Sequence, residues 1–348
     1  MDLSLGELSR EASASGFDLQ SLEKVLRMLS LLDALARHPF LKQRIALKGG
    51  TAINLFHFPM PRLSVDIDLN ILGVADPAHM SEDRPKIEQS ILAVCSREEL
   101  SVRWMSLDHA GGKIRLAYVS VAGGTGRLEL DLNFMLRTPL WPCVLSECHP
   151  IGAFRTAPVR VLDLHELTVG KIAALLARSA TRDIFDANAL LSLPELAMER
   201  LRLGFVVYGG MNRRDWRTVS TMDVTAEPWA VTRDLVPMLR KDLAPGKHEI
   251  AAWTNSLVVE CREKLACLLP LSKEELEFIT MLNDFGEIHP ELITGDITMQ
   301  ALLENHPGLR WKALNVRKYR GLDACRERDA RYIFPSVFQR LVFSPDEL

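Results

Sequence analysis

The fold is decided by residues Lys48–Asn70, which read KGGTAINLFHFPMPRLSVDIDLN. This segment predicts a small-residue turn, a short helix, a proline-bounded loop and then a strand that carries two carboxylates. The side chains of Asp66, Asp68 and Asn70 point to one face of that strand, because strand side chains alternate. Two aspartates on one face repel each other, and a divalent cation would offset the repulsion because magnesium prefers carboxylate oxygens as ligands. The strand therefore predicts a magnesium site.

The glycine pair at the start of the predicted helix indicates a phosphate site. Gly49 and Gly50 let the backbone approach a ligand closely. The beginning of the helix also directs its free N–H groups and the positive end of its dipole at the same space. A phosphate site beside paired carboxylates is typical of proteins that carry out nucleotide chemistry. Each half of the pattern is common alone, so its specificity comes from the combination in one short span.

This combination resembles the first motif of the polymerase β-like nucleotidyltransferases. More narrowly, KGGTA followed by RLSVDIDLN is similar to the AbiEii family, the nucleotidyltransferase toxins of type IV toxin–antitoxin systems. The resemblance implies Mg²⁺-dependent transfer of a nucleoside monophosphate from an NTP, with two metal ions held by Asp66 and Asp68. It implies a nucleotide site made by Lys48, Gly49, Gly50, Thr51, Arg62 and Ser64, in which Arg62 and Ser64 also fix the loop and the strand end.

A later strand offers a third carboxylate. Residues Leu128–Phe134 alternate between apolar and polar side chains, and Glu129, Asp131 and Asn133 share the polar face. Such a strand can simply be half-buried with one face in water. By resemblance to the superfamily, Asp131 completes the two-metal site and Glu129 is the alternative.

A second segment, DLHELTVGKIAALLARSATRDIFDANALL over residues 163–191, predicts two consecutive helices. Asp163 is the expected N-cap of a helix that runs to about Arg178, and Thr181 is the expected cap of the next. Lys171 lies among apolar residues, although a lysine on a helix usually belongs to a solvated face. This environment favours a role for Lys171 beyond solvation.

The same segment resembles the later AbiEii motifs, a lysine helix followed by Arg-Asp-x-x-Asp. By that resemblance, Lys171 contacts the phosphates of the nucleotide as a point charge, and Arg182 belongs to the nucleotide site. Asp183 and Asp186 would hold Lys171 and Arg182 in place or assist the acceptor group. Which of these two aspartates matters more stays open.

Length and composition predict a folded protein of more than one domain. The chain has 348 residues, of which 47% are hydrophobic and 25% charged, and a formal net charge of −3. No apolar run is long enough for a transmembrane helix, and the N-terminus lacks the pattern of a signal peptide. Six scattered cysteines without a CxxC pair argue against a zinc site and favour reduced thiols. We therefore expect a cytoplasmic protein without membrane contact.

Periodicity, together with the resemblance, predicts an α+β fold with a polymerase β-like mixed sheet and a mostly helical C-terminal region. Helices are expected over residues 19–36 and 85–97, strands over 45–47, 102–107, 113–121 and 127–134, turns at Gly111–Gly112 and Gly123–Gly124, and mainly helix after Leu162 with an interruption at Tyr208–Gly210. The expected division is an N-terminal helical segment (1–40), a nucleotidyltransferase core (41–145), a helical region that completes the active site (146–200) and a C-terminal domain (201–348).

Two basic segments with interleaved aromatic residues are candidates for RNA contact. They are Tyr208–Arg217, with Trp216, and Leu309–Arg331, with Trp311 and Tyr319. An amphipathic helix with an arginine-rich outer face explains the second segment equally well. The family resemblance favours tRNA as the acceptor and implies an antitoxin encoded separately. Nucleotidylation of a protein or a small molecule, and nucleotide-dependent regulation without turnover, are the alternatives.

Overall fold

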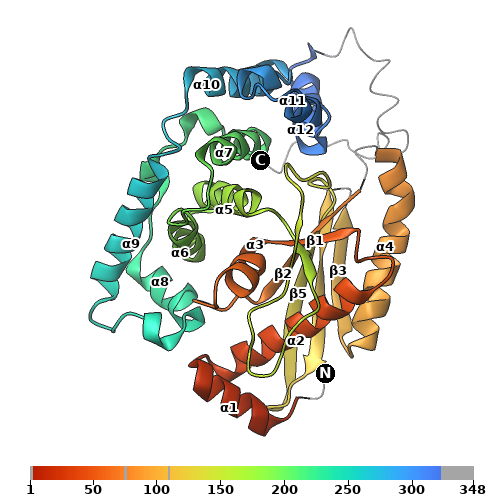
Figure 1. Ribbon diagram of the computed structural model, residues 1–348, viewed down its shortest axis with the longest axis vertical. Helices are drawn as coiled ribbons and strands as arrows, with labels where there is room; N and C mark the ends of the chain where they lie inside the picture. The colour runs from red at the N-terminus through yellow and green to blue at the C-terminus, as the bar shows by residue number, and fades with distance from the viewer. Residues whose placement is uncertain (1–2, 74–76, 109, 323–348) are drawn as a thin grey trace.

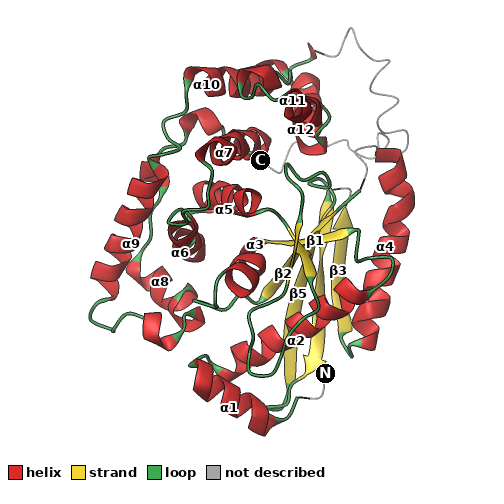
Figure 2. Cartoon of the chain, viewed as in Figure 1, coloured by secondary structure: helices red, strands yellow, loops and turns green. Residues whose placement is uncertain are grey.

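The computed structural model describes residues 3–73, 77–108 and 110–322. Over these ranges the chain forms a mixed seven-stranded sheet in the order β3-β4-β5-β2-β1-β7-β6, with helices around it (Figures 1 and 2). The strands are β1 (Ile45–Lys48), β2 (Asp66–Ile71), β3 (Ser101–Asp108), β4 (Gly111–Val119), β5 (Thr125–Asn133), β6 (Val144–Ser146) and β7 (Val159–Val161). The predicted α+β class is confirmed.

The central strand β2 runs antiparallel to β1 and parallel to β5. The chain reaches β2 from β1 through the three-residue helix α3 (Gly49–Thr51), which continues as a π-helix over Ala52–His57. This is the short helix that the glycine pair predicts. The helices of the N-terminal half are α1 (Leu5–Ser15), α2 (Leu19–Arg37) and α4 (Pro77–Arg97).

A helical half follows the sheet. Its helices are α5 (Leu164–Arg178), α6 (Thr181–Leu190), α7 (Met198–Met211), α8 (Pro228–Asp234), α9 (Ile250–Leu265), α10 (Lys273–Thr280), α11 (Ile297–Glu304) and α12 (Pro307–Tyr319). Short 3₁₀ turns join several of them. Figure 1 shows α5 and α6 beside the sheet, with α8 and α9 on one side of them and α10 to α12 above.

The sheet half and the helical half each have their own hydrophobic core. The first joins α1, α2 and α4 to the apolar face of the sheet, through residues such as Leu22, Leu69 and Leu130. The second packs the helices from α5 to α12 around residues such as Phe205 and Phe278. Because α1 and α2 share the first core, they are part of the packing of the sheet.

The structure corrects several details of the predicted elements. β6 and β7 extend the sheet where no strands are predicted, and α4 begins at Pro77, with Pro85 inside the helix. The pair Gly111–Gly112 begins β4 and makes no turn. Thr181 is the first residue of α6, and Ala180 is the N-cap.

The interruption predicted at Tyr208–Gly210 is also wrong, because these residues lie inside α7. A Cβ at Gly209 would overlap the indole ring of Trp216. This glycine is therefore needed for the close approach of Trp216 and does not break the helix.

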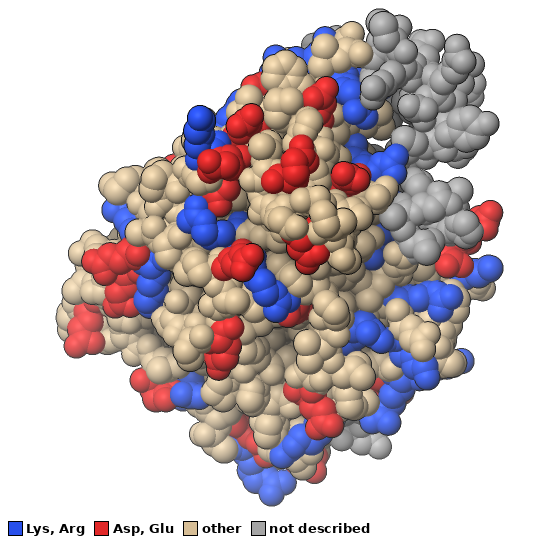
Figure 3. All heavy atoms as spheres, turned by 45° about the horizontal axis from the view of Figure 1, so that its top comes forward, with Lys and Arg blue, Asp and Glu red and all other residues tan. Residues whose placement is uncertain are grey.

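Surface charges of both signs are interspersed over much of the molecule. On the face shown in Figure 3, Lys and Arg side chains gather toward the right, the side on which Figure 1 places α4 and β3. None of the helices in the described ranges is both long and apolar enough to cross a membrane.

Candidate active site

A row of four charged residues crosses the polar face of the sheet. Lys48 on β1 pairs in register with Asp68 on β2, Asp68 with Asp131 on β5, and Asp131 with Lys113 on β4. Residues paired across neighbouring strands point to the same face. Two adjacent carboxylates are therefore flanked by a lysine on either side, and all four residues line one cavity of about 580 Å³.

A second row lies one pleat away on the same face. Asp66 pairs in register with Glu129, and Glu129 with Arg115. Nζ of Lys24, from α2, lies 3.9 Å from Oδ1 of Asp66. Arg115 donates from Nε to Oε1 of Glu129 at 3.0 Å.

The two candidates for the third carboxylate differ in their partners. Glu129 is engaged by Nζ of Lys113 at 2.8 Å in addition to Arg115, and these cations lower its pKa. Burial raises the pKa of Asp131, and the negative charge of Asp68 raises it further, against the opposing effect of Lys113. Oδ1 of Asp131 is buried without a hydrogen-bond partner among the described residues.

The glycine pair packs directly against the carboxylate strand. Gly49 has a φ of +73°, and a Cβ there would overlap Oδ2 of Asp68. A Cβ at Gly50 would meet Oγ of Ser64 at 2.8 Å and Nη2 of Arg62 at 3.0 Å. Backbone amides at the start of the helix can therefore approach a phosphate beside Asp68, because no side chain stands between them.

The side chain of Thr51 does not point to the phosphate site, although it was expected to contact the nucleotide. Its side chain is fully buried, and its hydroxyl donates to the backbone oxygen of Asp66 at 2.5 Å. The Thr51 side chain therefore ties the helix to the start of β2 and does not face the cavity.

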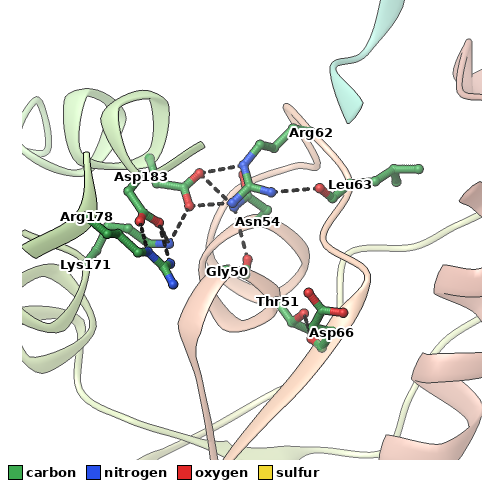
Figure 4. Close-up of polar contacts among 10 residues, drawn as sticks. Gly50, Thr51, Asn54, Arg62, Leu63, Asp66, Lys171, Arg178 and Asp183 are labelled. Atoms are coloured by element: carbon green, nitrogen blue, oxygen red, sulfur yellow. Dashed lines mark hydrogen bonds and ion pairs between the residues drawn. The ribbon is translucent and has the colours of Figure 1, made fainter. Parts of the chain in front are cut away.

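A buried ion-pair network joins the helical half to this site (Figure 4). Nζ of Lys171 lies 2.8 Å from Oδ1 of Asp183 and 3.0 Å from Oδ2 of Asp186. Asp183 also accepts from Nε of Arg178 at 2.7 Å, and Asp186 accepts from Nε of Arg62 at 2.7 Å. Asp183 and Asp186 thus hold Lys171 as predicted, but the guanidinium groups that they bind belong to Arg178 and Arg62, and not to Arg182.

The electrostatic effect of this network is strong enough to overcome burial. Burial alone would raise the pKa of Asp186, but Arg62 and Lys171 outweigh it and hold that pKa at about 2. For Asp183, burial is likewise outweighed by Lys171 and Arg178, which lower its pKa. Both aspartates are therefore ionised, and the lysine between them is held in one position at the wall of the cavity.

The remaining predicted nucleotide residues also reach the cavity. Arg62, Ser64 and Arg182 line it, as do Lys48, Gly49 and Gly50. Arg178 lines it too, although the sequence prediction did not include it in the site. Its position seven residues after Lys171, on the same stripe of α5, is the signal that could have identified it.

Glu166 and Tyr208 are further residues of the cavity that the prediction missed. The Tyr208 hydroxyl donates to Oε1 of Glu166 at 2.8 Å, and the backbone N–H of Leu140 donates to Oε2 at 3.0 Å. Burial raises the pKa of Glu166 to about 7. A carboxyl group that can titrate near neutral pH therefore stands in the wall of the same cavity.

The donor set fits magnesium when a nucleotide supplies part of the coordination. Within the described ranges, no three His, Cys, Asp or Glu side chains converge into a group that could hold a metal alone. Asp68 and Asp131 are neighbours, and Oδ1 of Asp131 has no hydrogen-bond partner in the part of the chain that the structure describes. Mg²⁺ is usually bound by one or two carboxylates together with substrate phosphates, so two hard oxygen donors beside a phosphate site suffice.

The first basic segment, a candidate for RNA contact, does not present its aromatic residues as a free surface. Trp216 is fully buried, and Tyr208 is bound to Glu166. Arg214 pairs with Asp223 at 2.8 Å, and Arg217 pairs with Asp215 and Asp284. In the second segment, Trp311 and Tyr319 lie on α12 with exposed fractions of 37% and 92%, and residues 323–331 lie outside the described residues.

Comparisons with known proteins agree with this geometry. The family described as "Nucleotidyl transferase AbiEii toxin, Type IV TA system" matches residues 30–253. Among solved structures, MenT4, a nucleotidyltransferase toxin from Mycobacterium tuberculosis H37Rv, superposes with a TM-score of 0.57 at 17% sequence identity, over 89% of this chain and 99% of MenT4. That identity supports a shared fold. No curated protein matches the sequence.

Proposed function

Because this chain belongs to the AbiEii family of nucleotidyltransferase toxins from type IV toxin–antitoxin systems, we propose that it transfers a nucleoside monophosphate from a magnesium-bound NTP to the 3′-terminal hydroxyl of an RNA, with tRNA as the acceptor. The observation that carries this proposal is the row of Lys48, Asp68, Asp131 and Lys113 on the cavity wall. It places paired carboxylates next to the glycine pair Gly49 and Gly50, and nucleotidyl transfer requires a metal site beside a phosphate site in this way.

In the proposed complex, the triphosphate lies against the start of α3. The backbone N–H groups of Gly49 and Gly50 contact phosphate oxygens, with Lys48 and Ser64 beside them. Lys171 faces the phosphates from the other wall and neutralises the charge that develops on the leaving pyrophosphate. Its two aspartate partners hold the ammonium group in place before the nucleotide arrives, so little reorganisation is needed.

The carboxylates of the sheet act on the acceptor and the α-phosphate. Asp66, Asp68 and Asp131 would hold Mg²⁺, which when bound supplies positive charge to the phosphate oxygens and increases the acidity of the acceptor hydroxyl. Asp131, which pairs in register with Asp68 and lines the cavity, would accept the hydroxyl proton as the new bond forms. The acceptor oxygen forms the new bond to the α-phosphorus as the bond to pyrophosphate breaks.

RNA is favoured as the acceptor by the resemblance to relatives that modify tRNA 3′ ends and by the basic side of the molecule seen in Figure 3. A toxin of this kind would act on a cellular RNA, and its cognate antitoxin would be encoded separately.

Labelling with α-³²P NTPs tests the proposal. Wild-type protein, Asp68→Asn and the exposed control Asp242→Asn are each incubated with one labelled NTP, Mg²⁺, and either total RNA or a protein extract. We expect label in the tRNA fraction with wild type and Asp242→Asn, and none with Asp68→Asn or without Mg²⁺. Label in protein alone, or equal labelling by Asp68→Asn, would contradict the proposal.

A further inference from the structure

An exposed tryptophan stands on the edge strand β3. Trp104 is 46% exposed and pairs in register with Arg115 on β4. The guanidinium carbon of Arg115 lies 5.0 Å from the centroid of the Trp104 ring. One face of the indole therefore carries a cation, while a large part of the side chain stays accessible to solvent.

A β-bulge places this side chain on the catalytic face of the sheet. The register of β3 against β4 shifts between Val102 and Trp104, so that Trp104 and not Arg103 lies opposite Arg115. Without the extra residue, alternation would turn Trp104 to the apolar face, where Ile114 of β4 is buried. Bulges commonly reorient a side chain in this way.

Trp104 is connected to the active site through two neighbouring strands. Arg115, opposite Trp104, binds Glu129 at 3.0 Å, and Glu129 pairs in register with Asp66. Three strand spacings separate Trp104 from Asp66, which corresponds to about 14 Å across the sheet. The indole therefore stands outside the nucleotide cavity, on the same polar face as the carboxylates.

Three cations lie on this face of the outer strands, and two of them, Lys113 and Arg115, are bound to Glu129. Lys113 and Arg115 on β4 and Arg127 on β5 share the polar face with Trp104, by the alternation of their strands. We name Trp104, Lys113, Arg115 and Arg127 the outer-strand patch.

We propose that the outer-strand patch binds the unpaired nucleotides next to the 3′ end of the acceptor RNA, with one base stacked on Trp104. Single-stranded nucleic acids are bound by aromatic side chains that stack with bases and by cations that contact the backbone. The patch supplies both, at a distance from Asp66 that leaves the terminal nucleotide free to enter the active site. This inference rests on the proposed RNA acceptor and adds the residue that positions it.

A second arginine–tryptophan pair provides a matched control. On α8, Arg233 lies 4.7 Å from the centroid of the Trp229 ring, and Trp229 is 61% exposed. This pair has the same chemistry but lies in the helical half and not on the sheet. If an exposed arginine–tryptophan pair bound RNA without regard to its position, Trp229 would contribute as much as Trp104.

The test measures RNA binding and nucleotide transfer separately. The variants Trp104→Ala, Trp104→Phe and Trp229→Ala are titrated against a fluorescent single-stranded RNA ending in a free 3′ hydroxyl and against a blunt duplex. Because base–aromatic stacking can contribute about 5- to 150-fold in affinity, we expect Trp104→Ala to raise the Kd for the single strand by a factor in that range. Trp104→Phe should restore most of that affinity, and Trp229→Ala should bind as wild type does.

Transfer kinetics complete the test. We expect Trp104→Ala to raise KM for RNA and leave KM for the NTP unchanged, whereas a general structural defect would change both. Unchanged single-strand affinity in Trp104→Ala, or an equal loss in Trp229→Ala, would overturn the inference. If wild type binds the single strand through Trp104 but labels no RNA, the proposed transfer to RNA is wrong, whereas RNA binding by the outer-strand patch is supported. If wild type labels RNA and Trp104→Ala is equally active, the patch alone fails.

Discussion

Arg62 and Asp186 form a buried bidentate ion pair between residues 124 positions apart in the chain, with Nε to Oδ1 at 2.7 Å and Nη2 to Oδ2 at 2.5 Å. Arg62 comes from the loop that precedes β2, and Asp186 comes from α6. The same carboxylate lies 3.0 Å from Nζ of Lys171. One pair therefore fixes the position of the carboxylate strand relative to the lysine that faces it across the cavity.

Breaking this pair should strongly destabilise the protein. Arg62→Ala leaves the buried Asp186 without its main partner, and removing one member of a buried pair typically costs about 3–5 kcal/mol. We expect a loss of that order in the free energy of unfolding, measured in urea. Arg37→Ala removes an exposed partner of Asp33 and serves as the control. An equal midpoint for the two variants would contradict the structural role of Arg62.

The stability contribution of Asp186 should disappear in acid. Its folded-state pKa of about 2 lies below that of an ordinary aspartate, because Arg62 and Lys171 outweigh burial. A lowered carboxyl pKa gives stability that is present above the unfolded-state pKa of about 4 and is lost as the pH falls to about 2. The difference in unfolding free energy between wild type and Asp186→Asn should therefore be constant above about pH 5 and shrink below pH 4. A constant difference from pH 7 to pH 2.5 would rule out the ionised pair.

Glu166 should give the opposite pH dependence. Burial raises its folded-state pKa to about 7, so the folded state binds the proton more tightly than the unfolded chain does. The resulting stability is present below about pH 4 and is lost as the pH rises through about 7, amounting to about 3 kcal/mol. Wild type should lose stability relative to Glu166→Gln over this range, measured by urea unfolding at each pH.

Tyr208→Phe gives an independent check on Glu166. The Tyr208 hydroxyl donates to the carboxylate and lowers the pKa of Glu166. Its removal should move the loss of stability to higher pH. If Tyr208→Phe and wild type share one pH profile, the hydrogen bond has no effect on this titration.

The sheet side of the site could be predicted because it follows from local rules. Alternation alone places Asp66 and Asp68 on one face, and the same rule applied to β5 places Glu129 and Asp131 together. The register that brings Asp68 next to Asp131 is a pairing between distant strands, and it follows only from the resemblance to a known fold. Alternation therefore identified the carboxylates but could not choose between the two on β5, and the preference for Asp131 came from the resemblance alone.

The helical side was predicted less completely, because ion-pair partners depend on tertiary packing. Asp183 and Asp186 were expected to hold Lys171 and Arg182 or to assist the acceptor group. Both bind Lys171, but Asp186 binds Arg62 from a distant loop instead of Arg182. The bulge that turns Trp104 to the catalytic face is likewise absent from any periodic pattern, because it changes the register by one residue. Partner choice and register are long-range properties that local spacing does not encode.

Gly49→Ala should abolish transfer without unfolding the protein. The new Cβ would overlap Oδ2 of Asp68, and the φ of +73° disfavours any residue with a side chain. Either effect displaces the carboxylate, and a shift of about 1 Å in an active site can cost about 100-fold in rate. We expect at least that loss in kcat/KM for the NTP. Gly6→Ala is the matched control, because its Cβ meets no atom of residues 3–73, 77–108 or 110–322 within 4 Å. Full activity of Gly49→Ala would refute the close packing of Gly49 against Asp68 on β2.

The two carboxylates of β5 should differ sharply in their contribution to catalysis. Glu129 is bound by Lys113 and Arg115, so its charge is already neutralised. Asp131 has a buried oxygen that finds no partner among the residues the structure describes, and its pKa is raised by burial and by Asp68. Asp131→Asn should therefore lower kcat by at least about 100-fold, in the range typical of a lost acid–base group, whereas Glu129→Gln should stay within about tenfold of wild type, as expected for a residue that acts only through its neighbours.

The Mg²⁺ concentration needed for activity should further distinguish Asp131→Asn from Glu129→Gln. If Asp131 contributes a ligand, Asp131→Asn should require a higher Mg²⁺ concentration for half-maximal activity, whereas Glu129→Gln should leave that concentration unchanged. Glu129→Gln also frees Lys113 and Arg115, so its effect should fall with increasing salt, because exposed charges are screened. If Glu129→Gln instead raised the Mg²⁺ requirement and Asp131→Asn did not, Glu129 would be the third carboxylate, and the unpartnered oxygen of Asp131 would need another explanation.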